Sequence, residues 1–272
     1  MEKIMLEVNN LNVTYNGKRK INHIVRDISF SIKEGECVVI LGESGSGKSM
    51  TMKAILGLLD NSFTITGKAL LNEQNILEMD KENLRKLRGK DITMILQNPM
   101  TCFDTLYRVG YQMKETLKTH TNWNNLEIHQ KSIDMLNIMQ IKSPEEVLKK
   151  YPHQLSGGML QRIMIGIALM LNPKILVTDE PTTAIDAITK FEVMKEFQRL
   201  KDNHTTMLFI THDLGVASLI ADRVIVMNKG KIVDEGTFAQ IISNPKDNYT
   251  RLLVEKRIAV MNKFKTSMEV VE

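Results

Sequence analysis

Cysteine is scarce in this sequence, with only Cys37 and Cys102 among 272 residues. Two cysteines cannot build a disulfide framework or a four-ligand zinc site, which favours a reducing compartment. Long apolar runs are also missing. The longest covers residues 163–171, about nine residues, whereas a membrane span needs roughly 20. The first ten residues lack the apolar core of a secretory signal, so no such signal is expected.

An excess of one charge is absent too, because 36 Lys and Arg residues face 32 Asp and Glu residues and leave a formal net charge of +4. This mild balance does not argue for a nucleic-acid-binding protein, which usually shows a clustered basic stripe. Hydrophobic residues make up 43% of the chain and charged residues 25%, which is ordinary for a globular protein with a sizeable core. Membrane-spanning, secreted, collagenous and disordered proteins are therefore excluded.

Short β-branched runs alternate with longer helical patterns, as in an α/β chain with parallel strands. Strands are predicted at residues 37–41, 92–96, 174–178, 206–210 and 223–227. Before residue 36, two strand-like segments follow one another without a helix, which predicts an antiparallel N-terminal subdomain. A hairpin is expected to turn at residues 228–230. Helical patterns, at 108–120, 125–139 and 144–150, predict a helical subdomain inserted at approximately residues 99–165.

A phosphate-binding loop follows the predicted strand at 37–41. Residues 42–49 read GESGSGKS and fit the pattern G-x-x-x-x-G-K-[ST] between a strand and a helix. The glycines let backbone N–H groups approach phosphate oxygens, Lys48 offers its charge to the β- and γ-phosphates, and Ser49 offers a hydroxyl to Mg²⁺. The helix that begins near Lys48 directs its positive dipole end at the same anion. Nucleotide binding is predicted for Gly42, Glu43, Ser44, Gly45, Ser46, Gly47, Lys48, Ser49 and Met50.

A second anion site is predicted where Ser156 and two glycines precede a helical run from Met159 to Leu171. A serine and bare N–H groups at a helix start can hold an anion, although Ser156 alone could be only an N-cap. Because one nucleotide has one γ-phosphate, a simple solution is that this second cradle serves the nucleotide of a partner chain.

Further motifs follow the phosphate-binding loop along the chain. They are LSGGMLQR at 155–162, ILVTDE at 175–180, ILQNPM around Gln97, the Ala184–Asp186 turn and ITHD around His212. With GESGSGKS, they resemble the ATP-binding subunits of ABC transporters over essentially the whole chain. The resemblance implies an α/β fold with a P-loop NTPase (RecA-like) core, and a single nucleotide-binding domain over residues 1–272 with a short tail at approximately 251–272.

The resemblance also implies roles for these residues. Glu180 would be the general base, and His212 would contact the γ-phosphate and the attacking water. Asp179, Ser49 and Gln97 would hold Mg²⁺, and Tyr15 would stack on adenine. The segment Leu155, Ser156, Gly157, Gly158 and Met159 would act in trans on a partner's ATP, beside Asp186 of the D-loop. Because ligands of a doubly wound sheet sit at the carboxyl ends of its strands, Gln97, Asp179 and His212 are expected to converge on one edge.

Within this family, three segments are similar to the peptide/nickel importer branch, at residues 98–113, 212–237 and 244–253. The branch implies two integral-membrane permease subunits, a second and related ATPase subunit, an extracellular solute-binding protein and no nucleic acid. It places the chain peripherally on the cytoplasmic face of the cell membrane. Peptide-type members commonly carry a C-terminal cysteine cluster, but no cysteine follows Cys102. Import of nickel or another transition metal, free or bound to a metallophore, is therefore favoured, with dipeptide or oligopeptide import as the alternative.

Two other classes of protein fit less well. A soluble ABC ATPase of DNA repair or translation predicts a long coiled-coil insert or tandem nucleotide domains, which 272 residues do not hold. A P-loop regulatory module without turnover would not need Glu180 and His212.

Overall fold

The computed structural model describes residues 3–17 and 21–256. The chain divides into two compact units, one of residues 1–78 and 210–272 and the other of residues 79–209. Of the predicted C-terminal tail, residues 257–272 lie outside the described residues. No helix in the described ranges has both the length and the apolar character needed to cross a bilayer.

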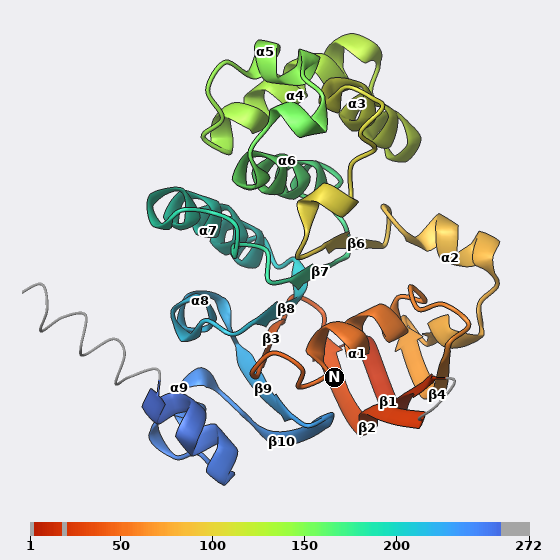
Figure 1. Ribbon diagram of the computed structural model, residues 1–272, viewed down its shortest axis with the longest axis vertical. Helices are drawn as coiled ribbons and strands as arrows, with labels where there is room; N and C mark the ends of the chain where they lie inside the picture. Colours follow the sequence, from red (N-terminus) through yellow and green to blue (C-terminus); the bar gives the residue numbers. More distant parts are fainter. Residues whose placement is uncertain (1–2, 18–20, 257–272) are drawn as a thin grey trace, which may run out of the picture. The chain divides into compact units, whose positions relative to one another are not determined.

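The first unit contains the predicted antiparallel subdomain (Figure 1). Its central strand β1 (Ile4–Asn16) pairs with β2 (Ile21–Lys33) on one side and β4 (Phe63–Leu71) on the other. The short β5 (Gln74–Asn75) closes the β4 edge and leads into a 3₁₀ turn, η1 (Ile76–Glu78). The pairing of β1 with β2 confirms the antiparallel N-terminus, whereas β4 and β5 were not predicted.

A second set of strands in this unit carries the phosphate-binding loop. Strand β3 (Cys37–Leu41) is buried at all five residues and runs parallel to β9 (Arg223–Asn228). Strand β9 turns back into β10 (Lys231–Gly236), which confirms the predicted hairpin. Lys229 and Gly230 both have positive φ, +49° and +80°, as a two-residue type I′ turn requires.

The first unit also contains the helices α1 (Lys48–Ile55), α8 (Leu214–Ile220) and α9 (Phe238–Ser243). Residues 248–256 are helical as well. The chain enters this unit from the other one within β8 (Thr206–Thr211), a strand buried at every residue.

The second unit contains a parallel pair of strands, β6 (Ile92–Ile95) and β7 (Ile175–Asp179). Between them the chain is mostly helical, as predicted. The helices are α3 (Val109–His120), α4 (Asn125–Ile138), α5 (Pro144–Lys149) and α6 (Gly157–Met170), with the short turns η2 (Pro99–Thr101) and η3 (Pro152–Gln154). Figure 1 shows α3, α4 and α5 gathered beside α6. Two further helices of this unit lie outside that segment, α2 (Lys81–Leu87) and α7 (Ala187–Asp202).

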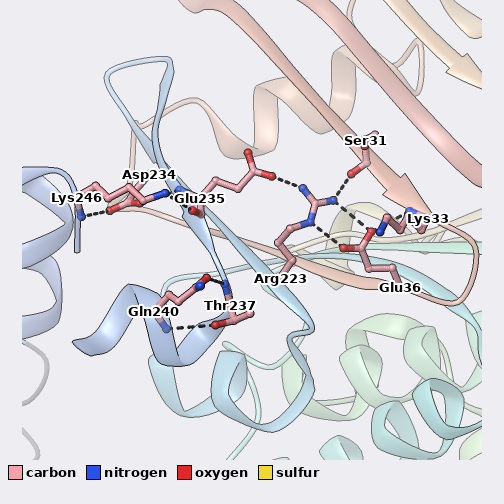
Figure 2. A network of polar contacts seen from close by, with 9 residues as sticks. All are labelled: Ser31, Lys33, Glu36, Arg223, Asp234, Glu235, Thr237, Gln240 and Lys246. Carbon is pink, nitrogen blue, oxygen red and sulfur yellow. Dashed lines mark hydrogen bonds and ion pairs between the residues drawn. The ribbon is translucent and has the colours of Figure 1, made fainter. Parts of the chain in front are cut away.

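The partly buried guanidinium of Arg223 joins four segments of the first unit (Figure 2). Arg223 Nε donates to Glu36 Oε1 at 2.8 Å, and its terminal nitrogens donate to Glu235 and to the carbonyl oxygen of Ser31. The Arg223 side chain is 22% exposed and that of Glu36 is 13% exposed. Removing one member of such a group leaves the opposite charge buried and unpaired.

We therefore expect Arg223→Met to lower the free energy of unfolding by about 3 kcal/mol, as is typical when half of a buried ion pair is removed. Denaturant titration of the full chain measures this change. The control is Arg199→Met, because Arg199 pairs with Glu196 while 68% exposed, and such a pair contributes about 0.5 kcal/mol. Equal losses in the two variants would contradict the structural role of Arg223.

Candidate nucleotide-binding and catalytic site

The phosphate-binding loop joins β3 to α1 as predicted, and two of its glycines allow no side chain. A Cβ at Gly42 would lie 2.5 Å from the carbonyl oxygen of Met227 and 2.6 Å from Ser46 Oγ. Gly47 is the N-cap of α1 with φ +105°, a conformation that residues with a Cβ rarely adopt. The loop therefore keeps its backbone bare where the positive end of α1 begins.

Lys48 folds back over the loop that precedes it. Its side chain is buried, and Nζ donates to the carbonyl oxygens of Gly42 at 2.8 Å and Glu43 at 3.0 Å. Ser46 is 5% exposed, and its Oγ has no hydrogen-bond partner among the described residues. A buried hydroxyl without a partner beside a buried ammonium fits a phosphate oxygen as the missing acceptor.

Two other predicted residues lie in this unit. His212 follows the last residue of β8 and is half-buried. Tyr15 lies near the end of β1, packs against Phe63 with ring centroids 5.2 Å apart, and keeps 41% of its surface exposed. An aromatic ring with an accessible face retains the surface that stacking on a base needs.

The second unit brings Gln97 and Glu180 together. Strands β6 and β7 pair in register, with Ile95 opposite Thr178, so the residues that follow them emerge at the same edge. Gln97 Nε2 donates to Glu180 Oε2 at 3.1 Å, and Thr183 Oγ1 donates to the same oxygen at 3.2 Å. Asp179, the last residue of β7, is 3% exposed.

The backbone of Glu180 has φ +48°. A non-glycine residue in the left-handed region costs of order 1–3 kcal/mol and persists only where the surrounding structure enforces it. Such strain is concentrated at functional sites. The conformation turns the chain sharply after β7, so that consecutive carboxylates, Asp179 and Glu180, occupy a buried and an accessible position.

Gln161 in α6 ties the ends of both strands to this helix, which the sequence did not predict. It is fully buried, and Nε2 donates to the carbonyl oxygen of Pro181 at 2.8 Å and to that of Leu96 at 3.4 Å. Leu96 precedes Gln97 and Pro181 follows Glu180. Two adjacent polar residues, Gln161 and Arg162, in a helical run that is apolar from residue 163 onward were the only signal for this contact.

The segment that resembles the ABC signature forms the start of α6. Ser156 is the N-cap, and its side chain accepts the N–H of Met159 at 3.2 Å. The helix begins at Gly157 rather than at Met159 as predicted, because this cap places both glycines in its first turn. A Cβ at Gly157 would meet nothing within 4 Å, whereas one at Gly158 would lie 2.8 Å from the carbonyl oxygen of Ala184.

Asp186 is the N-cap of α7, and Oδ1 accepts the N–H of Thr189 at 3.0 Å. The hydrogen bonds from the backbone and then the side chain of Thr189 lower the pKa of the Asp186 carboxyl. Burial lowers the pKa of the Arg162 guanidinium, and the negative charge of Asp186 opposes that effect. Arg162 donates to the carbonyl oxygens of Met139 at 3.0 Å and Gln140 at 2.7 Å, which holds α6 against the end of α4.

Comparison with known proteins agrees with these motifs. The ABC transporter family model matches residues 25–183. The metal-staphylopine import system ATP-binding protein CntD of Staphylococcus aureus (strain NCTC 8325 / PS 47) is 41% identical over 246 residues, which cover 90% of this chain and 91% of that protein. The oligopeptide transport ATP-binding protein AppD of Bacillus subtilis (strain 168) is 40% identical over 253 residues, 92% of this chain and 77% of that protein.

Among solved structures, the dimeric post-hydrolysis state of the ATP-binding cassette MJ0796 bound to ADP and Pi matches with a TM-score of 0.78 at 27% identity. The match covers 86% of this chain and 99% of that chain. This confirms the predicted fold, a P-loop NTPase core with an antiparallel β-subdomain and a helical insertion. The chain belongs to the ABC transporter family, in the branch of ATP-binding subunits that includes the metal-staphylopine and peptide import proteins, and it is an ATPase.

Proposed function

We propose that the chain acts as one nucleotide-binding domain over residues 1–272, with its helical subdomain at approximately 99–165, and that it hydrolyses ATP to power an importer. The observation that carries this proposal is the phosphate-binding loop, in which buried Lys48 and the unpartnered Oγ of Ser46 meet bare backbone. On binding, the Lys48 ammonium exchanges its two carbonyl partners for the β- and γ-phosphates. Tyr15 stacks on the adenine ring.

Mg²⁺ is the proposed cofactor, and Ser49, Gln97 and Asp179 are the residues that would hold it. They offer a hydroxyl, an amide and a carboxylate, the oxygen donors that this hard cation prefers. Because Gln97 already uses Nε2 toward Glu180, its Oε1 is the atom suited to a cation. When bound, Mg²⁺ neutralises charge on the phosphate oxygens.

Glu180 is the proposed general base. Gln97 and Thr183 fix its Oε2, and this orients the carboxylate that accepts a proton from the attacking water. His212 would hold the γ-phosphate and that water through its imidazole ring. Gln97 then has two duties, because the same amide contacts the base and the metal site.

The signature segment is proposed to act on a partner's nucleotide. The start of α6 offers the hydroxyl of Ser156 and the first N–H groups of a helix at Gly157 and Gly158, with open space at Gly157. An anion can therefore approach this helix from outside the chain. The partner is a second, related ATPase subunit, paired head to tail, and Asp186 of the D-loop would lie beside this contact.

Two integral-membrane permease subunits and an extracellular solute-binding protein complete the proposed complex, which places the chain on the cytoplasmic face of the cell membrane. The helical subdomain and the Gln97 loop are the proposed dock for the permeases. Leu106 and Tyr107 support this placement, because these neighbouring residues are 79% and 49% exposed, and exposed apolar side chains that lie close together often mark interaction surfaces.

The proposed cargo is nickel or another transition metal, free or bound to a metallophore. The similarity to the metal-staphylopine import protein over 91% of its length supports this choice. Import of dipeptides or oligopeptides is the second candidate, favoured by the similarity to oligopeptide and dipeptide transport proteins.

A deletion strain separates the two cargoes. Under scarce nickel, cobalt or zinc, the strain should accumulate less metal, and the wild-type gene should restore uptake. Lys48→Ala should not restore uptake, because it removes the charge that binds the phosphates. Growth on peptides as the sole amino-acid source should stay normal. Unchanged metal accumulation with failed growth on peptides would support peptide import instead.

A further inference from the structure

The segment at residues 244–253, NPKDNYTRLL, has no role in the reaction described above. Asp234 of β10 anchors this segment, and its side chain is buried, with 5% of the residue exposed. Asp234 Oδ2 accepts the backbone N–H groups of Lys246 at 2.8 Å and Asp247 at 3.3 Å, and Figure 2 shows the first of these bonds. A buried carboxylate thus fixes the backbone at the start of the segment.

This anchor sets the position of Tyr249. Asp247 Oδ1 accepts the backbone N–H of Tyr249 at 2.8 Å, and the helical residues 248–256 begin at this point. Thr250 is fully buried, and Leu253 and Val254 are 8% and 4% exposed. The segment is therefore packed against the first unit immediately before and after Tyr249.

The hydroxyl of Tyr249 reaches the phosphate-binding loop. Its Oη accepts the backbone N–H of Glu43 at 2.9 Å, and the carbonyl oxygen of Glu43 accepts Lys48 Nζ at 3.0 Å. Burial, the largest effect, raises the pKa of the Tyr249 phenol, so this group is neutral at physiological pH. Glu43 is thus held through its N–H by Tyr249 and through its carbonyl oxygen by Lys48.

We propose that Tyr249 is a positioning residue that holds the phosphate-binding loop in its nucleotide-binding conformation. The inference rests on the proposed function, because it assumes that this loop binds ATP. Without the hydroxyl, the Glu43 N–H donates to water instead, and the loop gains conformations that cannot bind phosphate. ATP then binds only to the fraction of molecules with the correct loop, so affinity falls while turnover of bound ATP is kept.

Tyr249→Phe removes the hydroxyl and keeps the ring. We expect the Kd of the full chain for Mg-ATP to rise roughly three- to tenfold, the effect of one net hydrogen bond. The kcat of the reconstituted complex should change less than about twofold. The matched control is Lys256→Ala, because Lys256 also contacts Glu43, at 3.6 Å, from the same helical residues. Both of those side chains are more than half exposed, so the control should shift Kd by less than about twofold.

Asp234→Asn tests the same path from its other end, and it decides the question if Tyr249→Phe does not fold. On its own it should weaken ATP binding. Where Tyr249→Phe folds, combining the two should weaken binding by no more than about a further twofold, because both act through one contact. The inference is overturned if Tyr249→Phe leaves Kd unchanged, if kcat falls with affinity, or if Lys256→Ala has the same effect. If Lys48→Ala also binds ATP normally, the proposed nucleotide site itself is wrong.

Discussion

Glu180→Gln should lower steady-state ATP hydrolysis of the reconstituted complex by roughly 10²-fold or more, the usual contribution of a general base. Glutamine keeps the shape of the side chain and an oxygen that accepts from Gln97 Nε2, but it cannot take a proton from water. ATP binding should persist. Turnover assays of wild type and variant measure the first effect, and nucleotide titrations measure the second.

The matched control is Glu192→Gln, which changes an exposed carboxylate in α7 that pairs with Lys195. It should hydrolyse ATP at the wild-type rate. The Glu180 variant should also accumulate as an ATP-loaded closed pair, detectable as a stable larger species by size-exclusion chromatography with ATP. Near-normal turnover in Glu180→Gln would show that another group is the base.

Gly157→Asp should abolish hydrolysis at the site that this chain completes in its partner. The new carboxylate would stand at the start of α6, where the proposed γ-phosphate approaches, and two like charges without water repel by several kcal/mol. ATP affinity of the isolated chain should hardly change, because its own phosphate-binding loop is intact. Hydrolysis by the assembled complex and nucleotide titration of the single chain measure the two effects.

Gly157→Ala separates charge from bulk. A Cβ at this position meets nothing within 4 Å, so alanine should fold normally and hydrolyse ATP far better than the aspartate variant. A large loss of ATP affinity in the isolated Gly157→Asp chain would instead assign the signature segment to the chain's own nucleotide.

The parts of the fold that could be predicted are those with strong local patterns. Strand β3 is buried on both faces and reads as a continuous apolar run, and its bounds match the prediction. None of the first six residues of β4 is buried, and Gly67, with φ +103°, interrupts the alternation of Phe63 and Ile65 with threonines after four residues. Helix α2 has no buried residue and is marked only by its Asp80 cap. Strand β4 forms by pairing with β1, and helix α2 by its cap. The periodicity of apolar residues indicates neither.

The candidate site divides in the same way. Residues of the phosphate-binding loop could be predicted because the backbone geometry demands glycine at fixed spacing. The contacts of Gln161 and Tyr249 join segments 20 or more residues apart in sequence. No local pattern encodes a bond between such segments, so their partners emerge only from the folded chain.

Helix α6 gives the proposed pair of ATPases a route for cooperativity. Its N-terminus would contact one nucleotide, while Gln161, about one turn further on, is bonded to the backbone beside Gln97 and Glu180 of the other site. If binding of the first nucleotide shifts α6, the bonds of Gln161 would carry that shift to the backbone beside Glu180, the proposed base for the second nucleotide. Steady-state hydrolysis should therefore depend sigmoidally on ATP concentration.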